Sequence, residues 1–195
     1  MRRFLKSDEG MISGAEFHVR RNTGSFGTIN YMANQDGFTL YDTVAYNYRH
    51  NEANGEDNRD GSEFNYSWNC GIEGATRKQV IRKMREQQMR NAFLMLLLSQ
   101  GTPMIYGGDE FANSQVGNNN AWCQDNAVGW TDWKNAKKQE NLSTFVKEAI
   151  AFRKKHPILH MPQEMRGVDY MAKGFPDISV PVSYTHLRAH ETLMN

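Results

Sequence analysis

The chain has 195 residues, a formal net charge of +1 and two cysteines. Its Lys and Arg residues are scattered, which argues against the clustered basic face of a nucleic-acid-binding protein, and no apolar run reaches the ~18 residues of a membrane span. The basic residues 1–6 are not followed by an apolar core, so they are not a secretory signal. We therefore expect a cytoplasmic protein with no nucleic-acid or membrane partner, in which Cys70 and Cys123 are free thiols.

Short apolar runs at residues 28–33 and 103–106 predict two β-strands. The first contains β-branched and aromatic residues and lies between Gly27 and Asn34, and the second ends at Gly107. Residues 11–17 are consistent with one or two helical turns. A long loop is expected between the first strand and Gly74, with residues 40–48 open to either a helical or a loop conformation.

Two longer segments predict α-helices. Residues 77–100 contain strong helix formers, with Thr76 as the expected N-cap and Gly101 at the end. The second half of this helix is apolar on all sides, so we expect it to be buried. Residues 141–155 have one apolar side. The order strand, loop, helix, strand, loop, helix predicts βα units in a parallel sheet, whose polar loops gather at one end.

The segment 30–74 has the composition of a sugar-binding loop. It places Asp36 just after the first expected strand and continues with many Asn, Asp and Glu residues. Its aromatic residues are Tyr41, Tyr46, Tyr48, Tyr66 and Trp68. Sugar hydroxyls need fixed donors and acceptors, and sugar rings need flat apolar walls. On position alone, Asp36 fits a catalytic role and a turn equally well, whereas a structural role is favoured for Asp109 and Glu110.

Ion-binding and phosphate-binding patterns are incomplete in this chain. The spacing of Glu56, Asn58 and Asp60 resembles the start of a calcium loop, but Ser67 stands where a glutamate is required. His50 lacks a partner histidine at zinc-binding spacing, and no glycine-rich phosphate loop is present. We therefore expect neither a metal nor a cofactor.

Several motifs, taken in order, resemble those of bacterial glycogen debranching enzymes, which belong with isoamylase and pullulanase to the alpha-amylase superfamily. The motifs are Asn34-Gln35-Asp36-Gly37-Phe38-Thr39-Leu40, His50-Asn51-Glu52-Ala53-Asn54-Gly55-Glu56, Asn58-Arg59-Asp60-Gly61, Trp68-Asn69-Cys70-Gly71, Gly101-Thr102-Pro103-Met104-Ile105-Tyr106-Gly107-Gly108-Asp109-Glu110, Gly117-Asn118-Asn119-Asn120 and Cys123-Gln124-Asp125-Asn126. The resemblance covers residues 1–180. It implies an α/β fold, an incomplete (β/α)8 TIM barrel whose strands seven and eight are the two expected here. It also implies hydrolysis of α-1,6-glucosidic branch linkages, with glycogen or a branched α-glucan as partner.

The resemblance assigns roles to individual residues. Retaining glycoside hydrolysis needs a nucleophile and an acid/base carboxylate, which the family takes from barrel strands four and five, upstream of this sequence. Asp36 aligns with a third family carboxylate, which binds sugar hydroxyls and stabilises the transition state. Gln35 replaces the usual histidine and keeps a donor without a positive charge. We interpret it as a substrate-binding variant, with loss of activity as the alternative, and expect Asn119 and Asn120 to contact substrate as well.

The resemblance also divides the chain. Residues 1–160 are expected to form the C-terminal portion of the catalytic barrel, and residues 161–180 to lead into a β-sandwich that is missing. Residues 181–195 are set apart, because 181–192 resemble translated sequencing-adaptor read-through, with a genuine polar tail as the alternative. The fragment itself is expected to be inactive. A non-catalytic glucan-binding protein derived from the same barrel is the second hypothesis, and a module with a purely structural loop is the third.

Overall fold

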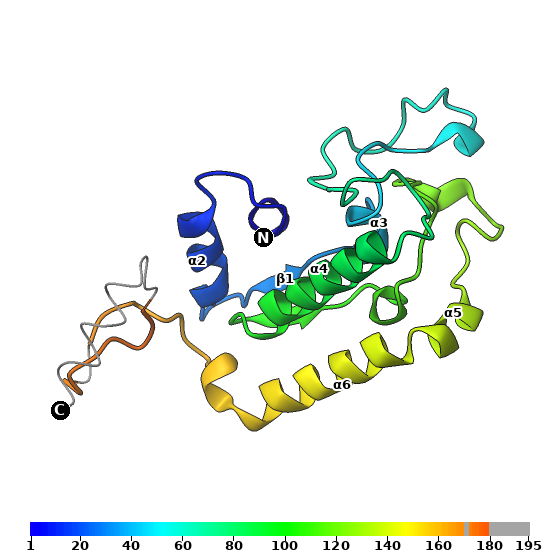
Figure 1. The fold of residues 1–195 in the computed structure, drawn as a ribbon. Helices are drawn as coiled ribbons and strands as arrows, with labels where there is room; N and C mark the ends of the chain where they lie inside the picture. The colour runs from blue at the N-terminus through cyan, green and yellow to red at the C-terminus, as the bar shows by residue number, and fades with distance from the viewer. Residues whose placement is uncertain (170–171, 180–195) are drawn as a thin grey trace.

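The computed structural model describes residues 1–169 and 172–179, and at its centre two strands lie side by side (Figure 1). β1 (Ile29–Tyr31) pairs in parallel with β2 (Thr102–Met104), with Asn30 opposite Pro103. The predicted parallel pairing is confirmed. Both strands are shorter than the apolar runs that predicted them, because the ladder ends where each backbone turns away into its loop.

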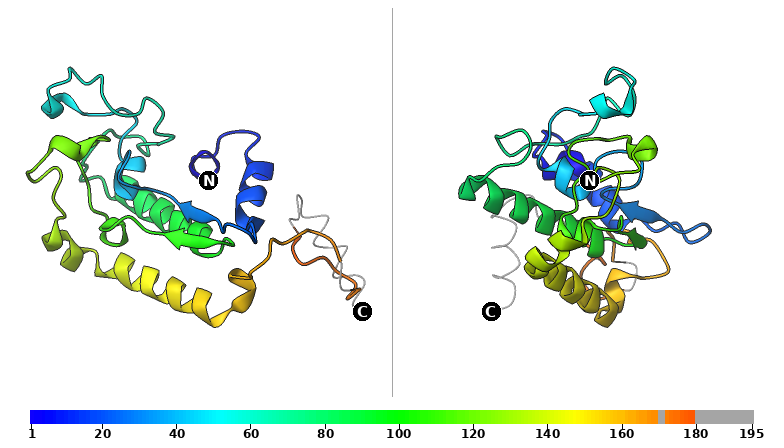
Figure 2. Two further views of the ribbon diagram at one scale, coloured as in Figure 1. Left: turned by 180° about the vertical axis from the view of Figure 1, so that it is seen from behind. Right: turned by 90° about the vertical axis from the view of Figure 1, so that its right-hand side faces the viewer.

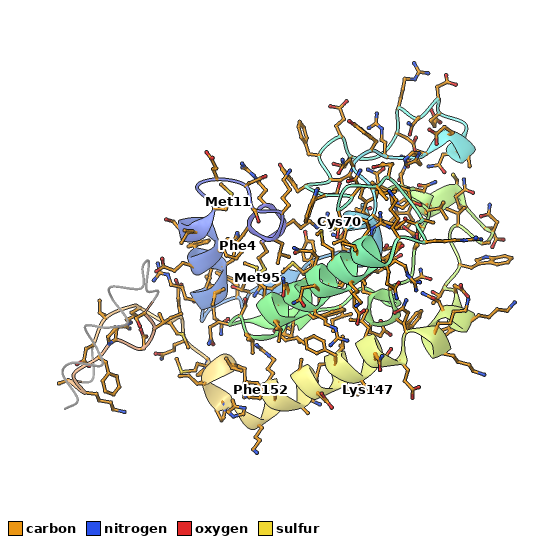
Figure 3. All side chains as sticks on the ribbon, in the orientation of Figure 1. Phe4, Met11, Cys70, Met95, Lys147 and Phe152 are labelled. Carbon is orange, nitrogen blue, oxygen red and sulfur yellow. The ribbon has the colours of Figure 1, made fainter. Side chains whose placement is uncertain are left out.

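Helix α4 (Gln79–Leu97) connects the two strands and packs against α6 (Glu140–Lys155), α1 (Arg2–Leu5) and α3 (Leu40–Thr43). Figures 1 and 2 show α6 running alongside α4 and the strand pair. The core lies between these elements and consists of Met32, Ala33, Leu40, Val44, Cys70, Met89, Ala92, Phe93, Leu96, Leu97, Ala112, Leu142, Val146 and Ala149. Both long helices were predicted, and their positions agree with the sequence pattern. The side chains of Lys147 and Phe152 lie on the exposed side of α6 (Figure 3).

The start of α4 corrects the expected N-cap. The residue at the N-cap position is Lys78, which has an extended backbone and makes no side-chain capping bond. Thr76 instead accepts a hydrogen bond from the Lys78 backbone amide at 3.2 Å. The hydroxyl is therefore used in a turn before the helix, a local competition that threonine often enters.

The second half of α4 is not buried on all sides. Phe93 and Leu97 are 1 % exposed, whereas Leu94 is 37 % exposed. Successive helical residues point about 100° apart, so packing against one side cannot cover Leu94. The expectation of complete burial was wrong for this side of the helix in the described part of the chain.

Shorter elements complete the fold. α2 (Ile12–Arg20) confirms the helical turns expected near residues 11–17. The remaining elements are α5 (Trp133–Lys138) and the 3-10 turns η1 (Glu52–Asn54), η2 (Asp109–Phe111), η3 (Ala121–Cys123) and η4 (Pro157–Leu159). None of the helices in residues 1–169 and 172–179 has the length and apolarity needed to cross a membrane. The tail set apart by the sequence, residues 181–195, lies outside the described residues.

Within residues 40–48, only the four residues of α3 are helical. Thr39 caps this helix by accepting a hydrogen bond from the Asp42 amide at 3.1 Å. The amides of Asn47 and Tyr48 donate to the carboxylate of Glu73, at 2.8 Å and 3.1 Å respectively. These amides are therefore unavailable to a continuing helix, which explains why the helix is short.

At the amino end of the strand pair, Gln100 joins three parts of the chain. Its backbone amide donates to Val19 O at 2.7 Å, and its carbonyl accepts from Asn30 Nδ2 at 2.7 Å. Its side chain donates to Ile158 O at 2.7 Å and accepts from the Met161 amide at 3.0 Å. All four polar groups of this buried residue are paired, as burial requires.

Arg153 supports the same end of the strands. It is 7 % exposed, and its guanidinium donates to the carbonyls of Leu97, Ser99 and Gly101 at 2.7, 2.6 and 2.5 Å. The last carbonyls of a helix have no partner within the helix, so Arg153 closes the end of α4 with side-chain donors. Burial lowers the pKa of Arg153 from its usual value.

Candidate functional site

The loops that follow β1 and β2 meet at the carboxyl end of the strand pair (Figure 1). They are joined directly through their backbones, because the His50 amide donates to Gly117 O at 2.7 Å. In parallel sheets, polar residues at this end are the ones available to bind ligands. The predicted gathering of the two polar loops is therefore confirmed.

Asp36 lies on the surface of this end, shortly after β1. Its amide donates to Asn34 Oδ1 at 3.1 Å, and its Oδ1 accepts from Trp122 Nε1 at 3.2 Å. Asp36 Oδ2 makes no hydrogen bond with residues 1–169 or 172–179. Gln35 is exposed beside it, and its side chain likewise has no hydrogen-bond partner in the part of the chain that the structure describes. Both side chains are thus available to a ligand.

Asp42 ties the first loop to the second from a fully buried position. It is 0 % exposed and accepts hydrogen bonds from Ser114 Oγ at 2.6 Å and from the Gln115 and Gly117 amides at 2.8 and 3.4 Å. Burial raises the pKa of Asp42 to about 6, although these hydrogen bonds favour the ionised form. The carboxylate therefore fixes a turn of the second loop.

Asp109 makes the reverse connection. It follows β2 and its Oδ1 accepts from the Leu40 amide at 2.8 Å, at the start of α3. Burial raises the pKa of Asp109 to about 7; the negative charge of Glu110 also raises it, whereas the Leu40 hydrogen bond and the positive charge of Arg2 lower it. Each loop therefore contributes one buried carboxylate that holds the other loop, the structural role that the sequence favoured for Asp109.

Asn119 lies inside the site. Its Oδ1 accepts from Asn51 Nδ2 at 2.8 Å and its amide donates to Asn51 Oδ1 at 3.0 Å. Its Nδ2 donates to Ser62 O at 2.7 Å and to Asn65 Oδ1 at 2.8 Å. With 2 % of Asn119 exposed, its polar groups are occupied by the chain itself. Substrate contact by Asn119 stays a prediction, whereas its role in joining the two loops is visible.

This arrangement requires a glycine at position 61. Gly61 has a φ of +74°, and a Cβ at this position would lie 2.1 Å from Asn119 Oδ1 and 2.9 Å from Asn51 Nδ2. Other residues are disfavoured by this backbone conformation as well as by the space. The short Asn-Arg-Asp-Gly motif that ends at Gly61 therefore has a steric cause.

Asn120 belongs to a neighbouring cluster around Asp60. Asn120 Nδ2 and Asn54 Nδ2 donate to Asp60 Oδ2 at 2.8 and 2.7 Å. Asn54 also accepts from Asn118 Nδ2 at 2.7 Å. The amide donors lower the pKa of Asp60. Asp60 Oδ2 and Asn54 Oδ1 accept these N–H groups, whereas Asp60 Oδ1 is buried without a hydrogen-bond partner among the described residues. The described residues contain no group of three His, Cys, Asp or Glu residues that could hold a metal.

A buried arginine holds the outer part of the first loop. Arg85, on α4, is 1 % exposed and donates to the carbonyls of Gly74 at 2.7 Å, Asn69 at 3.0 Å and Ala45 at 3.5 Å, and also to that of Ile72. The guanidinium of Arg85 thus supplies hydrogen bonds to a loop whose backbone is not paired in a β-sheet. The loop shape is therefore imposed by the helix behind it.

Sequence reasoning missed two residues of the site. Trp122 was not singled out, although it lies two residues after the Asn118–Asn120 motif. Asp42 was also overlooked, although the Thr39-x-x-Asp42 spacing is that of a capping motif and indicates a fixed carboxylate. Trp122 is 86 residues from its partner Asp36, and Asp42 is 72 residues from its partner Ser114. No local sequence pattern could therefore reveal these two contacts.

The chain was compared with protein-family models, curated proteins and solved structures. No family model matches. The chain is 48 % identical over 140 residues to "Glycogen operon protein GlgX homolog" of Mycobacterium tuberculosis, covering 72 % of this chain and 19 % of that protein. It is 41 % identical over 162 residues to "Isoamylase 1, chloroplastic" of Oryza sativa subsp. japonica, covering 79 % of this chain and 20 % of that protein. It is 46 % identical over 147 residues to "Glycogen debranching enzyme" of Enterobacter sp., covering 75 % of this chain and 22 % of that protein.

Solved structures agree at the level of the fold. A pullulanase from Paenibacillus barengoltzii, in complex with maltohexaose and alpha-cyclodextrin, matches with a TM-score of 0.58 and 20 % identity, covering 81 % of this chain and 22 % of that one. A pullulanase from Bacillus acidopullulyticus matches with a TM-score of 0.57 and 21 % identity, covering 81 % of this chain and 16 % of that one. The chain spans about a fifth of the length of the curated relatives it matches.

Proposed function

We propose that this chain, a homologue of glycogen debranching enzymes and isoamylases, forms one wall of the cleft in which such an enzyme hydrolyses α-1,6 linkages of branched glucans with retention. The observation that carries the proposal is the position of Asp36, exposed at the carboxyl end of β1 with one oxygen free. On this proposal β1 and β2 are barrel strands seven and eight, residues 1–160 are the barrel segment, and residues 161–180 lead toward a further domain. A cytoplasmic location is proposed with this role.

Asp36 acts on the substrate by binding, not by attack. Retaining hydrolysis uses a nucleophile and an acid/base carboxylate about 5–5.5 Å apart, and hydrogen bonds to sugar hydroxyls strengthen in the transition state. Asp36 Oδ2 is free to accept such a bond, and interactions that strengthen in this way lower the barrier selectively. The two reacting carboxylates belong to the longer protein, so the chain by itself has no hydrolytic activity.

Gln35 is the second residue that we place against the sugar. Its carboxamide offers a donor and an acceptor for hydroxyl groups, and both are free of contacts with the described residues. Asn119 is buried and Asn120 is half-buried. We propose that they serve the substrate by holding the second loop, and their many hydrogen bonds to the first loop support this role.

A chimera tests the proposal. The segment of the Enterobacter sp. enzyme that aligns with this chain, at 46 % identity, is replaced by the residues of this chain, and release of branches from glycogen is measured. We expect an active chimera that loses activity by on the order of 10²–10³-fold with Asp36→Asn, the scale of removing one preorganised transition-state contact. Asp125→Asn, an exposed aspartate on the second loop, is the matched control and should leave activity unchanged.

Two outcomes would favour other readings. A chimera that binds glycogen without cleaving it would support the non-catalytic glucan-binding protein. Introducing Gln35→His then separates a lost activity from a tolerated variant, because a gain of many orders of magnitude would show that the glutamine form is defective. A chimera in which Asp36→Asn retains full activity would overturn the proposed role of Asp36.

A further inference from the structure

Trp122 has a conformation that its own packing does not explain. It is 70 % exposed, although leaving a large aromatic side chain in water is unfavourable by roughly 25 cal/mol per Å² of apolar surface. It nevertheless has a fixed position, because its Nε1 donates to Asp36 Oδ1 at 3.2 Å. An exposed indole held against a carboxylate presents one polar edge and two apolar faces.

The turn that carries Trp122 is held on both sides. Before it, Asn120 donates to Asp60 at 2.8 Å. After it, Gln124 is buried and its Nε2 donates to Ala53 O at 3.0 Å and to Asn54 Oδ1 at 2.7 Å. Trp122 is therefore an exposed side chain on a preorganised turn, a combination that reduces the entropy cost of binding a ligand.

We infer that Trp122 is a substrate-binding residue on which a glucose ring of an α-glucan stacks while Asp36 accepts hydrogen bonds from its hydroxyls. The inference rests on the proposed function, which supplies the sugar at Asp36. The indole edge and the carboxylate are 3.2 Å apart, so a ring bound to Asp36 Oδ2 lies within reach of the indole. The indole N–H also orients the carboxylate, leaving Oδ2 for the sugar.

Trp130 offers a matched control within the same loop. It is 59 % exposed, and its Nε1 donates to Asp125 Oδ1 at 2.9 Å. The chemistry of the two pairs is the same, but Asp125 is five residues from its tryptophan and does not follow a strand. A general effect of removing an exposed tryptophan from this loop would therefore appear in both Trp122→Ala and Trp130→Ala.

The test is a titration of the full chain with maltotetraose, followed through the indole N–H signals of its four tryptophans in a ¹⁵N NMR spectrum. We expect the Trp122 signal, identified by its loss in Trp122→Phe, to shift and the Trp130 signal to stay. Because the Trp122 variants lack that signal, the affinities of all variants are measured by isothermal titration calorimetry, and Trp122→Ala should weaken maltotetraose binding at least tenfold. Trp122→Phe keeps a stacking face and should weaken it by less than about threefold, and Trp130→Ala should not change it.

The outcomes separate the proposed substrate class, a branched α-glucan, from the inferred role of Trp122. If the unaltered chain shows no shift in any signal with maltotetraose, the proposed substrate class is overturned, and this inference with it. If the chain binds but Trp122→Ala binds equally well, the inference alone is overturned. Equal weakening by Trp122→Ala and Trp130→Ala also overturns it, because the loss would then come from the loop in general.

Discussion

The two ends of the β1–β2 pair are built from different chemistry. At the amino end, the carboxamide of Gln100 and the guanidinium of Arg153 bind backbone carbonyls and amides. At the carboxyl end, two buried carboxylates, Asp42 and Asp109, hold the loops together. Neither Gln100 nor Arg153 changes charge near neutral pH, whereas both carboxylates have pKa values raised into that range.

This difference separates the two ends by the kind of group that fixes them. In barrels the amino end of the strands carries stability and the carboxyl end carries the active site. A buried carboxylate costs free energy to desolvate, and the carboxyl end of the strand pair carries two of them, Asp42 and Asp109. The free oxygen of Asp36 and the exposed indole of Trp122 lie at the end where the loops are fixed in this way.

Removing Asp42 should give the largest loss of stability. Asp42→Ala leaves Ser114 Oγ and two buried amides without their acceptor, and each unpaired buried group costs about 1–3 kcal/mol. We expect the free energy of unfolding, measured by urea titration, to fall by about 2–5 kcal/mol. Asp125→Asn, at an exposed position, should change it by less than about 0.5 kcal/mol. A similar small change for Asp42→Ala would mean that the carboxylate does not hold the second loop.

The sequence could predict the elements better than the connections between them. Periodicity located α4 and α6, and the apolar runs located the strands, because these signals are local. Asp42 was missed since its acceptor role depends on Ser114, and the side of α4 that stays exposed depends on which elements pack against it. Asp36 was singled out as a candidate from its place after a strand and from the family resemblance, but its contact with Trp122 required the folded loops.

At the other end, Gln100→Ala should destabilise the chain without affecting the site. The variant leaves Ile158 O and the Met161 amide without partners, so we expect the free energy of unfolding to fall by about 1–3 kcal/mol. The affinity for maltotetraose, measured as the shift of the Trp122 indole signal, should stay the same. Gln87→Ala, on the exposed side of α4, is the control for a lost carboxamide. A change in affinity with Gln100→Ala would contradict the separation of the two ends.

The effect most specific to the carboxyl end is the pH dependence of stability. Burial raises the pKa of Asp42 to about 6 and that of Asp109 to about 7 in the folded chain, from an ordinary value of 3.8. The folded state then binds more protons than the unfolded state between these values. The stability from these groups is therefore complete below about pH 4 and is lost as the pH rises to about 7, by at most about 1.4 kcal/mol per group and pH unit.

Asp109→Asn tests this dependence, because the asparagine oxygen still accepts from the Leu40 amide and no longer titrates. Between pH 5 and 7 we expect the fall in the free energy of unfolding to be about a third of that of the unaltered chain, since only Asp42, with the lower of the two raised pKa values, continues to titrate. Taking the difference between the two proteins removes the contribution of His18, whose pKa burial lowers. Parallel pH profiles for the two proteins would show that Asp109 is ionised at no cost, and would contradict its part in the pH sensitivity of the carboxyl end.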